Sequence, residues 1–213
     1  MVDPEERQAI LARALRYPYA APAGSYLYRD GAAGELPDAL DLGGREPLLA
    51  YGANAAPEAL ARKLASLPDR EMPVLRAELE DFDVVYSAHI SPYGAIPATL
   101  HRTPGTVAPL FVTYPDAEQM GLLAASEPNY ELRRLKRIRC RTELGEELTE
   151  IEAFVSRHGC LRLDGAEVAV AAIPSTGRRL AAMEEPDVLE RVRALREPER
   201  SLEDFILRKA HQL

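Results

Sequence analysis

Residues 47–67, PLLAYGANAAPEALARKLASL, contain the transition that decides the fold. The apolar run at 48–51 predicts a short buried strand, and this strand stops abruptly at Gly52. Gly52 and Asn54 are residue types that readily accept a left-handed backbone. Pro57 suits the first turn of a helix, and the leucines after it recur at the spacing of one helical face. The stretch therefore predicts a strand, a tight loop and a helix over 57–67.

Short strands and single helices follow this unit through the rest of the chain. Turn-forming pairs such as Pro104-Gly105 and Asp164-Gly165 separate the apolar runs, and Asp-Gly predicts a two-residue hairpin. Strands are predicted at 84–90, 98–101, 107–114, 130–140, 148–155, 160–163 and 168–173, and helices at 116–126, at 186–196 and from 201. Six to eight strands in this order predict an α+β fold. We expect a small mixed, mainly antiparallel curved sheet or barrel with flanking helices, and not a doubly wound parallel sheet.

The chain has 213 residues, and two regions differ in pattern. Residues 1–47 predict an N-terminal helix at 4–15 and then an irregular arm, rich in Tyr, Pro, Gly and Asp, at 16–47. Residues 48–213 predict the main domain, which ends in a hairpin and two helices. Long arms of this kind are either functional or mobile, and the sequence leaves both open.

Composition excludes several classes of protein. The net charge is −8 and aromatic residues are 6% with no Trp, which disfavours nucleic-acid partners. The basic run at 133–139 predicts a strand with solvated charges. Cys140 and Cys160 have neither disulfide-framework nor zinc-ligand spacing, and no metal motif is present. The acidic start is unlike a signal peptide and no apolar stretch is long enough to span a bilayer, so we expect a cytoplasmic protein without membrane contact.

The loop Tyr51-Gly52-Ala53-Asn54 is one candidate for binding chemistry. A glycine at a strand-to-helix turn lets a ligand approach the backbone, and the N–H groups there are suited to an anion or a developing oxyanion. The alternative is a turn that merely ends a strand. The tetrapeptide by itself favours that alternative.

Glu127 is the candidate for acid–base chemistry. It ends a helix of apolar and small residues just before Pro128, at the negative end of the helix dipole, which favours the protonated carboxyl group. A Glu so placed is suited to taking and returning a proton near neutral pH. The alternative is a solvated carboxylate at a helix end. His89 and His101 are predicted to be partly buried strand residues and not catalysts.

The order of these features resembles the gamma-glutamylcyclotransferase-like family. The resemblance covers roughly residues 48–140 and rests on a strand leading into YGAN, a Pro104-Gly105 turn before a strand, a helix ending in Glu127, and Tyr130 on the next strand. The family typically has Ser at the position of Ala53 and Gly at that of Pro128. A hydroxyl contact is lost at Ala53, although backbone contacts there can survive.

The resemblance implies a reaction and a site. The reaction is cyclisation of a gamma-glutamyl amide to 5-oxoproline with release of an amine or amino acid. The site has Glu127 as general acid and base, with Tyr51, Gly52, Ala53, Asn54 and Tyr130 as substrate-binding residues. No cofactor or metal is implied, and the expected partner is a small-molecule amide. The open alternatives are a non-catalytic binding or interaction protein on the same fold, and an enzyme acting on a different acyl or amine conjugate.

Overall fold

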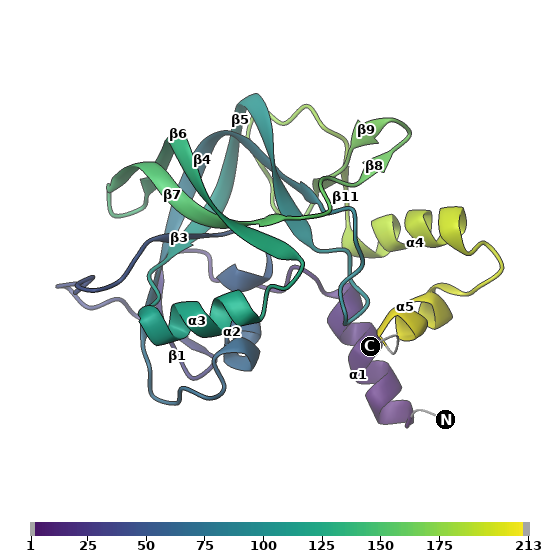
Figure 1. Ribbon diagram of the computed structural model, residues 1–213, viewed down its shortest axis with the longest axis horizontal. Coiled ribbons are helices and arrows are strands. Elements are labelled where there is room, and N and C mark those ends of the chain that lie inside the picture. Colours follow the sequence, from purple (N-terminus) through teal and green to yellow (C-terminus); the bar gives the residue numbers. More distant parts are fainter. Residues whose placement is uncertain (1–2, 211–213) are drawn as a thin grey trace.

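Five strands form a closed ring at the centre of the protein, in a computed structural model that describes residues 3–210 (Figure 1). In ring order they are β4 (Met72–Tyr86), β5 (Ala98–Thr113), β3 (Leu48–Ala50), β7 (Glu147–Ser156) and β6 (Tyr130–Thr142), and β6 pairs back onto β4. All of these pairings are antiparallel except that of β3 with β7. The sheet is therefore a small, mainly antiparallel barrel, and the predicted α+β fold class is confirmed.

Shorter strands extend or flank this barrel. The chain before the barrel contributes β1 (Tyr26–Arg29), which pairs with β4, and β2 (Ala32–Gly34), which pairs with β1. The chain after it contributes β10 (Ala169–Val170), which pairs with β4, and β11 (Ala182–Met183). A separate hairpin, β8 (Arg162–Leu163) and β9 (Ala166–Glu167), turns at Asp164-Gly165 as predicted.

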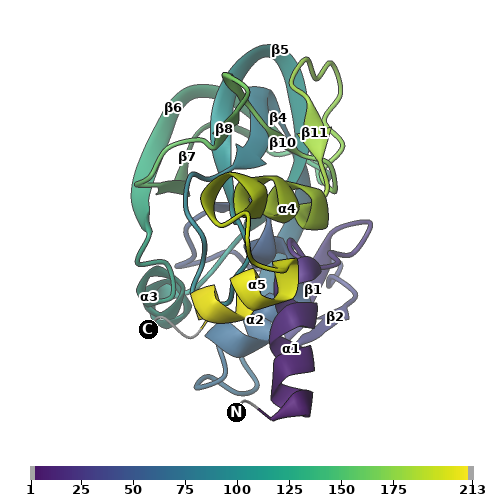
Figure 2. The same ribbon diagram turned by 90° about the vertical axis from the view of Figure 1, so that its right-hand side faces the viewer.

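The helices lie in two groups outside the barrel (Figures 1 and 2). Two lie at one end of the barrel: α2 (Pro57–Lys63) and α3 (Ala117–Ala125). Three gather to one side: α1 (Pro4–Leu15), α4 (Glu185–Arg196) and α5 (Leu202–Ala210), with α5 in contact with both of the others. Among the described residues, no helix is long and apolar enough to cross a membrane.

Alternate residues of the same strands pack into two hydrophobic clusters, because side chains along a strand point to opposite faces. Leu49 and Val112 belong to the larger cluster, which also holds buried residues of α1, α4 and α5. Their neighbours Leu48 and Phe111 belong to a second cluster with Leu123 of α3 and Leu60 of α2. The helices α2 and α3 thus cover the outer face of β3 and β5. The loop before α2 and the turn after α3 therefore lie beside each other.

The strand boundaries differ from the predicted ones in the first half of the chain. β4 begins at Met72 and not near 84, and β5 is one strand where two were predicted. Pro104-Gly105 does not turn the chain. Gly105, with φ of 81°, lies where the pairing register of β4 and β5 shifts next to Glu80. Charged residues such as Glu78 and Glu80 hid the strand, because one side of it faces solvent. Helix α2 is also shorter than predicted and ends at Lys63.

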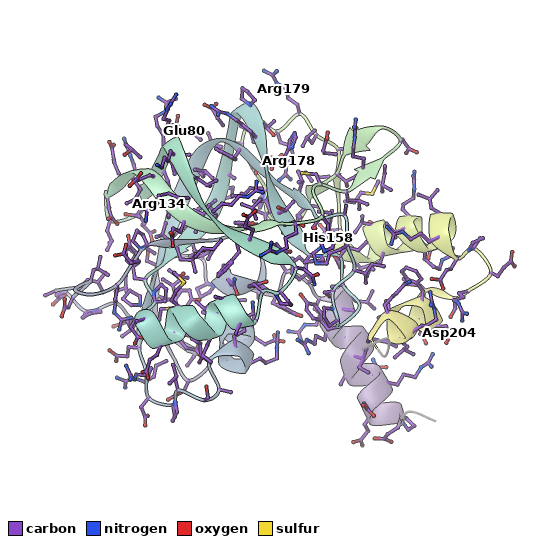
Figure 3. The ribbon with its side chains drawn as sticks, in the orientation of Figure 1. Glu80, Arg134, His158, Arg178, Arg179 and Asp204 are labelled. Atoms are coloured by element: carbon purple, nitrogen blue, oxygen red, sulfur yellow. The ribbon has the colours of Figure 1, made fainter. Side chains whose placement is uncertain are left out.

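The basic run at 133–139 lies on β6, as predicted, and its charges are largely paired on the outer surface. Arg134 lies 3.6 Å from both Glu150 and Glu152, and Arg139 lies 2.6 Å from Glu80. Figure 3 shows Glu80 and Arg134 on the outside of the barrel. The run is a solvated strand face with compensated charge.

Candidate active site

Glu127 follows α3 in a tight turn that leads directly into β6. The helix starts with a capping box between Asp116 and Gln119 and ends at Ala125. The Glu127 N–H then donates to Ala124, and the Glu127 carbonyl accepts from the N–H of Tyr130. The Glu127 side chain is only 15% exposed. This turn directs the carboxylate away from bulk water.

Asn54 and Lys63 contact the Glu127 carboxylate. The Asn54 amide Nδ2 donates to Glu127 Oε1 at 3.0 Å, and the Lys63 ammonium lies 2.5 Å from the same oxygen. Lys63 also donates to Asn54 Oδ1 at 2.7 Å. One carboxylate, one amide and one ammonium therefore converge from the YGAN loop, α2 and the end of α3. The ammonium and the carboxylate thus form a part-buried ion pair.

These three side chains line a cavity of about 600 Å³. Tyr51, Ala53 and Tyr130 from the predicted site line it too, as does Pro128, whereas Gly52 lines a second cavity of about 440 Å³. The first cavity also includes residues that the sequence did not suggest, among them Arg13, Tyr17 and Tyr19 of the N-terminal segment and His89 and Tyr93 of the loop after β4.

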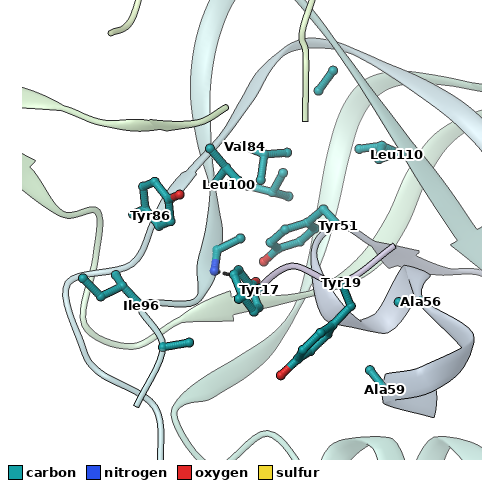
Figure 4. Close-up of a cluster of buried hydrophobic side chains, with 14 of the residues drawn as sticks. Tyr17, Tyr19, Tyr51, Ala56, Ala59, Val84, Tyr86, Ile96, Leu100 and Leu110 are labelled. Carbon is teal, nitrogen blue, oxygen red and sulfur yellow. Dashed lines mark hydrogen bonds between the residues drawn. The ribbon is translucent and has the colours of Figure 1, made fainter. Parts of the chain in front are cut away.

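Gly52 has φ of 87°, and the side of its Cα where a side chain would project is filled by Tyr17. A Cβ atom at this position would be 2.4 Å from the Tyr17 hydroxyl oxygen. That hydroxyl accepts the backbone N–H of Ala98 at 2.7 Å. The Tyr17 hydroxyl therefore closes this side of Gly52 to a ligand, and approach of a ligand to the Gly52 backbone stays a prediction for the side that faces the second cavity. Figure 4 shows Tyr17 beside Tyr51, with Tyr19 nearby.

The donors of the YGAN loop are fewer than expected. The N–H groups of Ala55 and Ala56 are already used by the carbonyls of Gly52 and Ala53 in a single 3₁₀ turn, Ala53–Ala55. Within the described chain, the N–H groups of Ala53 and Asn54 donate to no recorded acceptor. Two residues that line the cavity therefore have backbone donors that the described chain does not use.

Five tyrosine rings form much of the cavity wall: Tyr17, Tyr19, Tyr51, Tyr93 and Tyr130. Burial raises the pKa of every one of these phenols, so the hydroxyl groups stay protonated at neutral pH. Tyr51 donates to the carbonyl of Phe154, and Tyr130 donates to that of Ala98 at 2.8 Å. Tyr51 and Tyr130 therefore offer a ligand their rings and not their hydroxyl groups, which already have acceptors.

Two arginines lie over these rings. The Arg13 guanidinium is 4.4 Å from the centre of the Tyr93 ring, and that of Arg62 is 4.8 Å from the centre of Tyr19. Arg62 also pairs with Glu58. Arg13, Arg62 and Lys63 thus place three cations on the cavity wall. Among the described residues that line the cavity, Glu127 is the one carboxylate. The cavity is therefore suited to a ligand that carries a negative charge and an apolar part.

The cavity residues that the sequence did not suggest have no motif around them. Lys63 lies one helical turn after Ala59, which is buried and lines the same cavity. Only that i, i+4 relation could have pointed to Lys63. His89 lies in a loop and not in a predicted strand, since β4 ends at Tyr86. His101 is on β5, as predicted, with Nδ1 3.7 Å from Cys160 Sγ.

The comparisons with known proteins are structural only. No family model and no curated protein matches the chain. A solved structure named gamma-glutamyl cyclotransferase aligns at 17% identity over 54% of this chain and 68% of that chain, with a TM-score of 0.42. An uncharacterized protein from Homo sapiens aligns at 15% identity over 76% of this chain and 86% of that chain, with a TM-score of 0.42. A protein from Arabidopsis thaliana aligns at 14% identity over 59% and 77%, with a TM-score of 0.43.

One of these structures carries the name of the family that the sequence resembles. These identities and scores transfer no activity and no residue role. The site rests on the geometry of this chain's own side chains.

Proposed function

We propose that the protein cyclises a gamma-glutamyl amide to 5-oxoproline and releases an amine or amino acid. The observation that carries the proposal is the convergence of Glu127, Asn54 and Lys63 on the wall of one cavity. A positioned carboxylate supplies proton transfer, and an adjacent cation and amide supply binding for the charged end of an amino acid.

The reaction needs no enzyme nucleophile. The α-amine of the substrate attacks its own γ-carbonyl carbon, and Glu127 takes the proton that the attacking nitrogen loses. The tetrahedral intermediate then collapses, the bond from carbon to the leaving nitrogen breaks, and Glu127 returns the proton to that nitrogen. Holding the chain folded makes use of the high effective molarity of an aligned intramolecular attack. The free N–H groups of Ala53 and Asn54 are the candidate donors to the oxyanion.

Lys63 has a specific role in this proposal. Its ammonium contacts the Glu127 carboxylate and so holds that group in position for the first proton transfer. It is also the nearest cation for the substrate's α-carboxylate. Lys63→Met should therefore raise KM and lower kcat together, and the measurement is steady-state release of 5-oxoproline.

The direct test replaces the carboxylate. Glu127→Gln removes the base and should lower turnover of gamma-glutamyl amides by roughly 10²–10⁴-fold. The single variant also leaves a part-buried ammonium without its counter-ion, which lowers stability. The double variant Lys63→Gln, Glu127→Gln removes both charges at once and separates loss of folding from loss of chemistry. Glu118→Gln, on the exposed side of the same helix, is the matched control and should keep full activity.

Binding without turnover is the second candidate function. One observation favours it: Glu127 Oε1 already has two partners, Lys63 and Asn54. A panel of gamma-glutamyl dipeptides and alkylamides separates the candidates. Release of 5-oxoproline from none of them, with saturable binding of some, would establish the binding protein. Turnover that Glu127→Gln retains would remove Glu127 from the mechanism.

A further inference from the structure

His89 lies on the wall of the first cavity and is tied to a buried pair of serines. The Ser87 hydroxyl oxygen is 2.7 Å from His89 Nδ1 and 2.6 Å from the Ser156 hydroxyl oxygen. The Ser156 oxygen in turn accepts the backbone N–H of His158 at 3.0 Å. Ser87 and Ser156 are 0% and 7% exposed. The arrangement is a hydrogen-bonded chain that ends on the imidazole ring.

The hydrogens of this chain can be placed by counting acceptors. If Ser156 donates to Ser87 and Ser87 donates to His89 Nδ1, both hydroxyl hydrogens have acceptors. In the reverse direction Nδ1–H donates to Ser87 and Ser87 donates to Ser156. The Ser156 hydrogen is then buried without a recorded acceptor in the described chain. An unmatched buried donor is costly, so the first direction is preferred.

This direction sets the tautomer of His89. Because Nδ1 accepts, the ring hydrogen of neutral His89 lies on Nε2. A charged ring would need Nδ1 to donate and would force the costly arrangement, so the serine pair also opposes protonation. Burial and then the neighbouring His158 ring lower the pKa of His89 to about 4. The ring is held between His158, 4.6 Å away between ring centres, and the Tyr130 ring, 5.7 Å away.

Nε2 is the free end of this chain. Among residues 3–210 the Nε2 atom has no hydrogen-bond partner. The buried side-chain atoms without a partner in that range are the Tyr19 hydroxyl and Glu185 Oε2, so Nε2 is not buried. It is therefore accessible on a residue that lines the cavity. An oriented N–H donor without a protein acceptor is what a ligand oxygen requires.

We propose that His89 is a specificity-determining donor, whose Nε2–H binds a carbonyl or carboxylate oxygen on the leaving half of the ligand. The assignment to that half rests on the proposed function. In the proposed reaction Lys63 binds the α-carboxylate of the substrate, and the N–H groups of Ala53 and Asn54 donate to the oxygen of the reacting carbonyl. His89 is a further donor on the wall, and a leaving amino acid carries the matching acceptor while a plain alkylamine does not.

The ring itself gives a readout that is independent of turnover. Nitrogen-15 NMR of the histidine side chains should show His89 as the Nε2–H tautomer from pH 7 down to about 5, and Ser87→Ala should mix the two tautomers. Adding γ-glutamylalanine to Glu127→Gln protein should shift the Nε2 resonance, and γ-glutamylethylamide should shift it little. An Nδ1–H tautomer, or no shift with either compound, would overturn the proposal.

Kinetics with a matched pair of variants then tests the donor. Gln carries an N–H donor near the position of Nε2, and Met has the same length without one. His89→Met should raise KM for γ-glutamylalanine by roughly tenfold to a hundredfold, with kcat much less affected, and His89→Gln should recover most of the loss. KM for γ-glutamylethylamide should change in neither variant. Equal loss for both compounds would show that the ring only supports the wall. Absence of 5-oxoproline from every compound, with the NMR shift retained, would refute the proposed reaction and leave the His89 donor standing.

Discussion

Gly52 combines a backbone constraint with a packing constraint. Its φ of 87° and ψ of −139° lie in a region that is almost restricted to glycine. A Cβ atom would also meet the Tyr17 hydroxyl oxygen at 2.4 Å. Gly52→Ala should lower the free energy of unfolding by at least about 1–3 kcal/mol, the usual cost of such a conformation.

A double-mutant cycle separates the two causes. Tyr17→Phe removes the oxygen, so it should recover the packing part of the loss in Gly52→Ala and leave the backbone part. Urea unfolding of the four proteins measures both. Wild-type stability in Gly52→Ala would show that the loop relaxes without cost.

His89 makes stability depend on pH. The ring gains its proton near pH 6.5 when unfolded and near 4 when folded, since burial and His158 disfavour the charged form. Between these values the unfolded chain binds more protons, so stability should fall as pH falls from 6.5 to 4. Comparing unfolding of wild type and His89→Gln at half-unit steps measures this contribution. Parallel pH profiles for the two proteins would refute it.

At the scale of elements, α4 holds the 87–97 loop through its first residue. Glu185 is 2% exposed, and its Oε1 accepts the N–H of Ile96 at 2.7 Å, while Oε2 has no partner among the described residues. Burial raises the pKa of this carboxyl group well above its ordinary value. The folded protein therefore keeps a proton that the unfolded chain releases above about pH 4.5.

The raised pKa of Glu185 makes stability fall as pH rises, whereas the lowered pKa of His89 makes stability rise with pH. Between pH 4.5 and the raised pKa the folded state binds more protons, so ionisation of Glu185 costs stability as pH rises. Glu185→Gln stays neutral and keeps an acceptor for Ile96. Its melting temperature should exceed that of wild type most at pH 8 and approach it at pH 4.5. A variant that is less stable at every pH would show that the native carboxyl group is required.

The elements differ in how far the sequence could predict them. Helix α3 was predictable because Asp116 and Gln119 form a local capping box and Pro128 stops it. β4 was not, because Pro73 and the acidic residues after it obscure a pattern that only its neighbours in the barrel explain. The same limit applies to the site. Asn54 and Glu127 belong to local turns with recognisable sequence, whereas the contacts of Lys63 and His89 depend on how distant elements pack.

At the scale of the whole molecule, three segments distant in sequence meet behind the cavity. The Cα of Gly94 faces Ile206 of α5 and Ala14 of α1, since a Cβ there would be 2.7 Å and 3.6 Å from their side-chain carbons. Ala14 and Ile206 are fully buried. Tyr93, next to Gly94, is part of the cavity wall, and so is Arg13 of α1. Packing of α5 therefore supports two parts of the wall.

Ile206→Ala tests this support. Loss of a fully buried aliphatic group should lower the free energy of unfolding by about 2–5 kcal/mol. Because the cavity left faces Gly94, the substrate KM should rise even where the protein remains folded. Leu195→Ala, in the neighbouring helix and 69% exposed, is the control and should change neither quantity. A large stability loss with unchanged KM would show that the wall does not depend on α5.

The contact between α1 and α5 also joins segments that are made at different times during synthesis. Arg7 and Glu203 pair at 2.8 Å across 196 residues of chain. On a ribosome the helix that carries Arg13 emerges early, the barrel strands emerge next, and α5 emerges after them. The barrel can pair its strands while α1 still lacks the helix against which it packs. A chain that stops at residue 200 should therefore still form the barrel, but it should bind ligand more weakly, because α5 is not there to pack against Gly94 and Ala14. We thus expect a newly made molecule to reach full affinity only after α5 has been made.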